Sequence, residues 1–140
     1  MKKTYVALVL GQPPDVGTFD TLHARHPTQR LRFTGKGTTG KRAITHVRVA
    51  ERFPGAARVE IDLETGRTHQ IRMHFAEAGF PLFGDALYGG KRVTRPEVIG
   101  RQALHAWKLS LAHPQSGRTL NFTAPLPPDF KAAERALAKR

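Results

Sequence analysis

The chain has 140 residues, which is the length of one domain and enough to bury a single hydrophobic core. It carries 23 Lys and Arg against 11 Asp and Glu, a formal net charge of +12. Such a balance favours nucleic acid as a partner over an anionic membrane surface or a merely solubilising charge. Cysteine is absent, which excludes disulfides, thiol catalysis and Cys-containing zinc sites and fits a cytoplasmic location.

The first expected element is a strand over residues 5–10, where apolar side chains do not alternate with polar ones. Such a run is typical of a strand buried on both faces. It is too short for the core of a signal peptide, and the loop at Gln12–Gly17 ends it without a cleavage site. No stretch approaches the length of a membrane span, so no membrane partner is expected. The strand begins almost at Met1 and is therefore expected to lack a neighbour.

Residues 23–42 are basic and rich in Gly and Thr. They predict either a loop or loose hairpin that phosphate could order, or a solvated connector. Gly35–Lys41 imitates the phosphate-binding loop of nucleotide hydrolases, but Arg42 replaces the magnesium-binding Ser or Thr, and a strand pattern follows where a helix is needed. Nucleotide hydrolysis is therefore excluded. The basic residues of this segment are Arg25, Arg30, Arg32, Lys36, Lys41 and Arg42.

The middle of the chain predicts a hairpin followed by a helix. Residues 44–49 and 59–63 alternate as strands do, and Pro54-Gly55 makes the turn between them. Apolar residues at helical spacing then predict a helix from about His69 to Ala78, with Thr68 as its N-cap and Gly79 as its end.

The last third predicts a loop, a second hairpin and a final helix. Its segments are a loop at 81–90, strands at 104–111 and 120–123 joined by a turn at 114–117, and a helix at 130–139 capped by Asp129. Together the elements indicate an α+β fold, with a mostly antiparallel mixed sheet and a few helices, over one domain at residues 1–140.

The start of the predicted helix concentrates hydrogen-bond donors. A metal site on His69 and His74 is not expected, because their spacing of five places them roughly 140° apart on a helix. A helix N-terminus favours anions, and arginine recognises carboxylate or phosphate with two parallel bonds. The segment therefore indicates an anion site, with a solvated basic helix as the alternative. The donors are Arg67, His69, Gln70, Arg72 and His74.

Four ordered stretches carry a resemblance to a known family. Gly66–His74 resembles the G-R-T-H-Q-I-R-x-H signature of the RluA-type RNA pseudouridine synthases, and Lys3–Val9 resembles their K-x-Y-x-A-x-V strand. Gly79–Gly89 resembles G-x-P-I-x-G-D-x-x-Y-G, and the segments at 104–114 and 124–127 resemble the closing L-H-A, H-P and A-P-x-P. The resemblance covers nearly the whole chain and implies conversion of uridine to pseudouridine in rRNA or tRNA.

One motif of that family has no counterpart in this sequence. The family's catalytic aspartate lies in an H-R-L-D-x-x-T-S-G loop before the K-x-Y strand, and the 140 residues contain no such loop. We therefore expect a separate or upstream segment to carry that aspartate, and we expect the domain here to be a partial one. The family's missing front half would then also supply strands beside the first strand.

The resemblance assigns roles to individual residues. Tyr5 would stack on the uracil and help to handle its C5 proton, Arg72 would pair with the catalytic aspartate, and Ile71 would line the base pocket. No metal and no organic cofactor is implied. The residues expected to contact RNA or to anchor the helix start are Lys3, Arg67, His69 and Gln70.

Three hypotheses follow for the function. The chain is part of a pseudouridine synthase, or a catalytically inactive RNA-binding module, or a remnant that does not fold stably, the last because an unpaired first strand is an aggregation hazard. Arg72 needs an anionic partner if it is buried, since removing one partner of a buried pair costs roughly 3–5 kcal/mol. It is therefore expected to lie in water, to find another anion, or to depend on a second segment.

Overall fold

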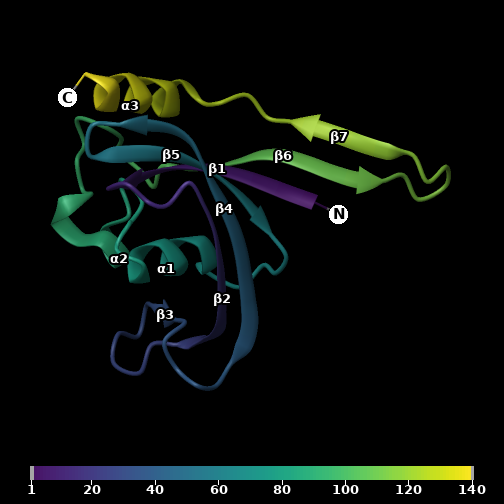
Figure 1. Ribbon diagram of the computed structural model, residues 1–140, viewed down its shortest axis with the longest axis horizontal. Coiled ribbons are helices and arrows are strands. Elements are labelled where there is room, and N and C mark those ends of the chain that lie inside the picture. The colour runs from purple at the N-terminus through teal and green to yellow at the C-terminus, as the bar shows by residue number, and fades with distance from the viewer. Residues whose placement is uncertain (1, 140) are drawn as a thin grey trace.

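The computed structural model describes residues 2–139, and Figure 1 shows one curved sheet with helices on both faces. The seven strands lie in the order β3-β2-β4-β5-β1-β6-β7, and every pairing between them is antiparallel. The predicted α+β class with a mostly antiparallel sheet is therefore confirmed. The elements are β1 (Lys2–Leu10), β2 (Val16–Arg25), β3 (Phe33–Thr34), β4 (Lys41–Phe53), β5 (Ala56–Leu63), α1 (Gln70–Glu77), α2 (Ala86–Gly89), a 3-10 turn η1 (Gly90–Arg92), β6 (Leu104–Ala112), β7 (Thr119–Thr123) and α3 (Pro128–Ala138).

Strand β1 lies inside the sheet, with β5 on one side and β6 on the other. The prediction that its neighbours would have to come from outside this sequence is wrong, because the chain folds back and supplies both. Helix α3 covers one face of β1 and helix α1 covers the other, so Val6, Ala7, Leu8 and Val9 are all at most 2% exposed. The prediction of a strand buried on both faces is confirmed.

Two hydrophobic clusters flank the central strands. The first joins Val6 and Leu8 to Phe130 and Leu137 of α3. The second joins Ala7 and Val9 to Ile71 and Phe75 of α1. Burying apolar surface on both sides of one strand is the main favourable term in folding. It also fixes the position of α1 and of the loop before it, where the candidate site lies.

The basic segment 23–42, called the basic lobe below, is the far end of a long hairpin formed by β2 and β4. As the sequence predicts, most of it is loop, with one short strand, β3, that pairs with the end of β2. Its short strand β3 lies beside α1 in Figure 1, where Glu77 accepts bonds from the Thr34 hydroxyl at 2.5 Å and the Gly35 N–H at 2.8 Å. Strand β4 begins at Lys41, so the strand that the sequence predicts after this glycine-rich stretch, where a nucleotide-hydrolase loop needs a helix, is confirmed.

Helix α1 starts one residue later than predicted, and Thr68 is not its N-cap. That position belongs to His69, which has φ of 59° and makes no side-chain capping bond. At the other end Gly79 has φ of 92°, as expected for a residue that ends a helix. The predicted loop at 81–90 contains α2, capped by Asp85. Helix α3 begins with Pro127 as its N-cap, so Asp129 lies in its first turn rather than at the cap.

The second hairpin forms as predicted, from β6 and β7, and extends away from the rest of the molecule in Figure 1. Within residues 2–139, no helix combines the length and the apolar character needed to cross a membrane.

Candidate active site

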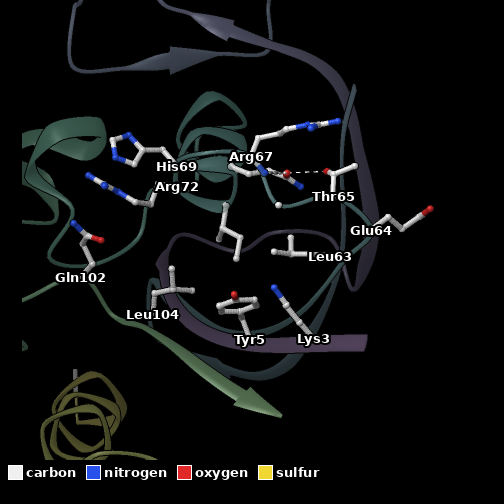
Figure 2. Close-up of a pocket in the computed structure, with 13 residues that line it drawn as sticks. Lys3, Tyr5, Leu63, Glu64, Thr65, Arg67, His69, Arg72, Gln102 and Leu104 are labelled. Atoms are coloured by element: carbon white, nitrogen blue, oxygen red, sulfur yellow. Dashed lines mark hydrogen bonds between the residues drawn. The ribbon is translucent and has the colours of Figure 1, made fainter. Parts of the chain in front are cut away.

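A cleft of about 530 Å³ opens beside the start of α1, bounded by β1, by the end of β5 with the loop that follows it, and by the start of β6 (Figure 2). These segments are far apart in the sequence, and the sheet order brings them together. His74, a donor of the anion site that the sequence predicts, does not line this cleft, but the other residues assigned to the site lie in its wall. These residues are Lys3, Tyr5, Arg67, His69, Gln70, Ile71 and Arg72.

One wall of the cleft is apolar. Tyr5 is half-buried on β1 and packs, with Leu63 and Leu104, against the hydrophobic cluster that contains Ile71. In Figure 2 the Tyr5 ring lies between Lys3 and Leu104. Aromatic and aliphatic side chains of this kind suit a flat, uncharged ring, which gains from stacking and from loss of contact with water.

Gln70 fixes the loop that leads into α1. Its amide nitrogen donates to the Ile44 carbonyl at 3.0 Å and to the Thr45 hydroxyl at 2.9 Å. Its amide oxygen accepts from the Thr65 hydroxyl at 2.8 Å and from the Arg67 N–H at 3.0 Å. A glutamine amide has two donor hydrogens and two acceptor positions, so this capacity is fully used inside the protein. The geometry therefore fits the anchoring role expected for Gln70 and leaves no group for an RNA contact.

The same polar network continues to His74, which lies on the buried face of α1. Its Nε2 lies 2.7 Å from the Thr21 hydroxyl and its Nδ1 lies 2.8 Å from the Thr45 hydroxyl. Burial lowers the pKa of His74 from 6.5 to about 4, with a smaller contribution from His23. His74 is therefore neutral at neutral pH and ties α1 to β2 and β4.

Arg72 has an anionic partner within the chain. Its Nε donates to Asp85 Oδ2 at 3.0 Å, and its Nη2 donates to Asp85 Oδ1 at 2.9 Å. The Asp85 side chain is fully buried, whereas that of Arg72 is 13% exposed. Of the three situations expected for Arg72, the structure has the second, in which another anion pairs with it. The pair uses Nε and Nη2, which leaves Nη1 for a further acceptor.

His69 stands next to Arg72 at the head of the helix. Its left-handed backbone costs roughly 1–2 kcal/mol for a residue with a Cβ, and it is the one non-glycine residue with positive φ between residues 2 and 139. Strained backbones of this kind persist where surrounding contacts hold them. The contact here is from His69 Nδ1 to the Tyr88 hydroxyl, at 2.9 Å. Burial, and next the charge of Arg72, lower the pKa of His69.

Lys3 and Arg67 border the cleft and keep their charges near solvent. Lys3 is exposed on β1, and Arg67 is partly exposed with its Nε donating to the Arg42 carbonyl at 3.0 Å. Glu64 also lines the cleft, but it is bound to His46 and points away from the other labelled side chains in Figure 2. The rim of the cleft is therefore mostly cationic.

A metal is not suggested by the arrangement. The two histidines near α1 have different partners, since His69 bonds Tyr88 whereas His74 bonds two threonines. Among the residues that the structure describes, no group of three or more His, Asp or Glu is arranged to hold a metal ion.

The family of the chain follows from comparison with known proteins. The sequence model of the RNA pseudouridylate synthase family matches residues 1–77, which include Tyr5, Arg72 and the loop before α1. The chain belongs to this family. The resemblance to RluA-type synthases is therefore confirmed, with this chain covering part of such proteins.

Several curated synthases are similar in sequence. An uncharacterized RNA pseudouridine synthase of Chloroflexus aurantiacus is 46% identical, over 100% of this chain and 43% of its own length. Proteins of Neisseria meningitidis serogroup A and Nitrosomonas europaea, both named ribosomal large subunit pseudouridine synthase D, are each 43% identical. Their matches cover 93% and 98% of this chain but 37% and 41% of theirs. The chain thus spans less than half the length of these relatives.

Two solved human structures have a similar fold. RNA Pseudouridylate Synthase Domain Containing 1 superimposes with a TM-score of 0.77 at 28% identity, over 94% of this chain and 58% of that one. RNA Pseudouridylate Synthase Domain Containing 4 gives a TM-score of 0.75 at 21% identity, over 97% and 62%, and supports the fold alone.

Two residues near Arg72 were not assigned to the site by sequence reasoning, namely Asp85 and Tyr88. Both lie in the G-D-x-x-Y-G stretch, which was noted only as part of the resemblance. A signal was available, because an Asp–x–x–Tyr spacing after a glycine suits a short capped helix. The sequence gives no means of telling that this helix would meet the Arg72 side chain.

Proposed function

We propose that this chain is part of an enzyme that converts uridine to pseudouridine in RNA, with residues 1–140 forming one part of its catalytic domain. The observation that carries the proposal is the cleft, where an apolar wall around Tyr5 and Ile71 adjoins the cation of Arg72. The proposed substrate is ribosomal or transfer RNA, and the names of the Neisseria and Nitrosomonas relatives favour ribosomal RNA. The proposed location is the cytoplasm, where such RNA is found.

The conversion of uridine to pseudouridine needs a pocket that can hold a free uracil ring, and this cleft suits that need. The bond between ribose C1′ and uracil N1 breaks, the base turns, and C1′ joins C5, which then loses its proton while N1 gains one. A uridine in a folded RNA must first leave its stack and enter a pocket. Tyr5 and Ile71 would hold the base by stacking and apolar contact, and the Tyr5 hydroxyl would handle the C5 proton.

The cationic side chains around the cleft would hold the RNA backbone. Lys3 and Arg67 lie at the rim, and the His69 ring lies beside Arg72 in the same cleft (Figure 2). The basic lobe lies next to Arg67 and would extend the phosphate-binding surface, since the Arg67 side chain bonds the backbone at Arg42. Gln70 would act only by positioning the loop, because its amide is saturated by the protein.

The reacting carboxylate is the part that this sequence does not identify. Asp85 is a poor candidate, since it is fully buried and both its oxygens bond Arg72. The H-R-L-D loop of the family has no counterpart in the 140 residues. We propose that a segment outside this sequence supplies the aspartate and pairs it with Arg72 Nη1, which would keep it ionised and oriented.

The experiment joins the chain to an H-R-L-D segment taken from a full-length synthase of the family and supplies RNA tritiated at uracil C5. Isomerisation exchanges that position with water, so tritium release measures the reaction. The joined protein should release tritium, its Arg72→Lys variant should not, and an Arg58→Lys control, whose pairing with Glu134 lies on the α3 side, should behave as the parent. If the joined, folded protein releases no tritium from ribosomal or transfer RNA, the proposal is wrong.

A second candidate function is RNA binding without catalysis, favoured by the net charge of +12 together with the cationic rim of the cleft. It predicts RNA binding by the chain alone that weakens by roughly 10³–10⁵ between 50 and 200 mM salt, for 6–10 phosphate contacts. Binding that does not change with salt would argue against it. The remnant hypothesis loses its motivation, because β1 is paired on both sides.

A further inference from the structure

The short helix α2 contacts both the cleft and the basic lobe. Its cap, Asp85, accepts hydrogen bonds from Nε and Nη2 of Arg72, and the Tyr88 N–H also lies 3.3 Å from Asp85 Oδ1. Paired parallel bonds between a guanidinium and a carboxylate fix direction as well as distance. The plane of the Arg72 guanidinium is therefore set by a carboxylate that solvent does not reach.

The Tyr88 ring adds a second restraint on the same guanidinium. Its centroid lies 5.1 Å from the Arg72 guanidinium carbon and 4.9 Å from that of Arg32, a residue of the basic lobe. Cations favour the faces of aromatic rings at such distances. Tyr88 therefore contacts one arginine of the cleft and one of the lobe.

The Tyr88 hydroxyl connects the same two regions by hydrogen bonds. Its oxygen accepts the Phe33 N–H of β3 at 2.9 Å, which leaves the phenol proton free to be donated to His69 Nδ1, also at 2.9 Å. Burial raises the pKa of Tyr88, so the hydroxyl keeps that proton. The Tyr88 hydroxyl thus links β3 of the basic lobe to His69, the strained N-cap residue of α1.

We propose that Asp85 and Tyr88 are positioning residues, which fix Arg72 and His69 in the cleft before any carboxylate or RNA arrives and connect them to β3 of the basic lobe. A role of this positioning in catalysis rests on the proposed function, whereas the positioning of Arg72 and His69 itself does not. Arg72 would then need no second segment to hold its orientation. Movement of β3 on RNA binding would reach His69 through Tyr88.

The test measures hydrogen exchange of arginine Nε–H groups by NMR in the 140-residue chain. In the parent protein the Arg72 Nε–H should exchange at least about tenfold more slowly than that of Arg67, whose single bond lies near solvent. In Asp85→Asn this protection should fall by about tenfold. The Asp129→Asn variant is the matched control, because Asp129 makes the same two-bond fork with Arg101 outside the cleft.

The hydroxyl of Tyr88 is tested by Tyr88→Phe, a milder change that keeps both ring contacts. Losing a donor to Nδ1 should raise the pKa of His69 measured by NMR, because the lost bond favours the neutral ring. The charged groups around His69 are Arg72, Asp85 and Arg25, and all of them remain. An unchanged His69 pKa, or an Arg72 Nε–H in the parent that exchanges as fast as that of Arg67, would overturn the proposal.

The joined protein separates this proposal from the proposed function. There Tyr88→Phe should lower the isomerisation rate by about tenfold while RNA affinity stays the same, since positioning acts on the reacting geometry. If the joined parent protein does not isomerise uridine, the proposed function fails, and the two NMR results still decide whether Asp85 and Tyr88 hold Arg72 and His69.

Discussion

Replacing His74 by glutamine should flatten the loss of stability that we expect for the protein in mild acid. The parent ring is 2% exposed, bonds the hydroxyls of Thr21 and Thr45, and stacks on Phe19 at 5.2 Å between ring centroids. Burial, assisted by His23, lowers its pKa to about 4, while the charges of the Glu77 and Asp20 carboxylates act in the opposite direction. The folded protein therefore resists protonation of this ring, whereas the unfolded chain does not.

The sign and size of the effect follow from proton linkage. Because the folded pKa of about 4 lies below the unfolded value of 6.5, the unfolded state binds more protons between them. The contribution to stability is complete above pH 6.5 and is lost as pH falls through about 4. At about 1.4 kcal/mol per pH unit over that interval, the loss amounts to roughly 3 kcal/mol.

Urea unfolding at a series of pH values between 4 and 7.5 measures this directly. The His74→Gln protein should be less stable at neutral pH, but its free energy of unfolding should fall by about 3 kcal/mol less on acidification than that of the parent. The pKa values of His23 and His69 are also lowered, and their contributions remain in both proteins. His113→Gln, in the turn after β6, is the control. Parallel curves for His74→Gln and the parent would refute the reasoning.

Two further predictions concern backbone conformation, and urea unfolding checks both. At His69, with φ of 59°, glycine should be more stable than alanine by about 1 kcal/mol, and the opposite order would mean that the left-handed backbone is not strained. At Gly84, an added Cβ would lie 1.9 Å from the Arg101 carbonyl oxygen, so Gly84→Ala should cost more than about 3 kcal/mol. Gly55→Ala, also at positive φ but with open space around it, should cost only about 1–2 kcal/mol; equal costs would contradict the predicted clash.

The strands and the gathering of the cleft residues were predictable because they depend on local patterns and ordered motifs. The alternation of apolar and polar residues over 59–63 predicts β5, and the unbroken apolar run at 5–10 predicts a strand buried on both faces. The motif at Gly66–His74 marked the loop and the start of α1 that form one wall of the cleft.

The errors arose where long-range pairing decides the structure. The neighbours of β1 are β5 and β6, and no local feature of residues 2–10 shows that later segments return to flank it. Likewise, Thr68 looks like a good cap from its residue type, but the Gln70 amide already binds the preceding loop and His69 takes the cap. The pairing of Arg72 with Asp85 joins two motifs through tertiary structure, which a one-dimensional pattern does not encode.

The most direct test of the proposed function maps pseudouridine across the ribosomal and transfer RNA of the source cells, by carbodiimide modification and reverse transcription, before and after deletion of the gene. At least one pseudouridine should disappear on deletion and return when the parent gene is restored, but not when it carries Arg72→Lys. If every pseudouridine persists in the deleted strain, the protein does not make pseudouridine in these RNAs and the account of the cleft as its active site is contradicted.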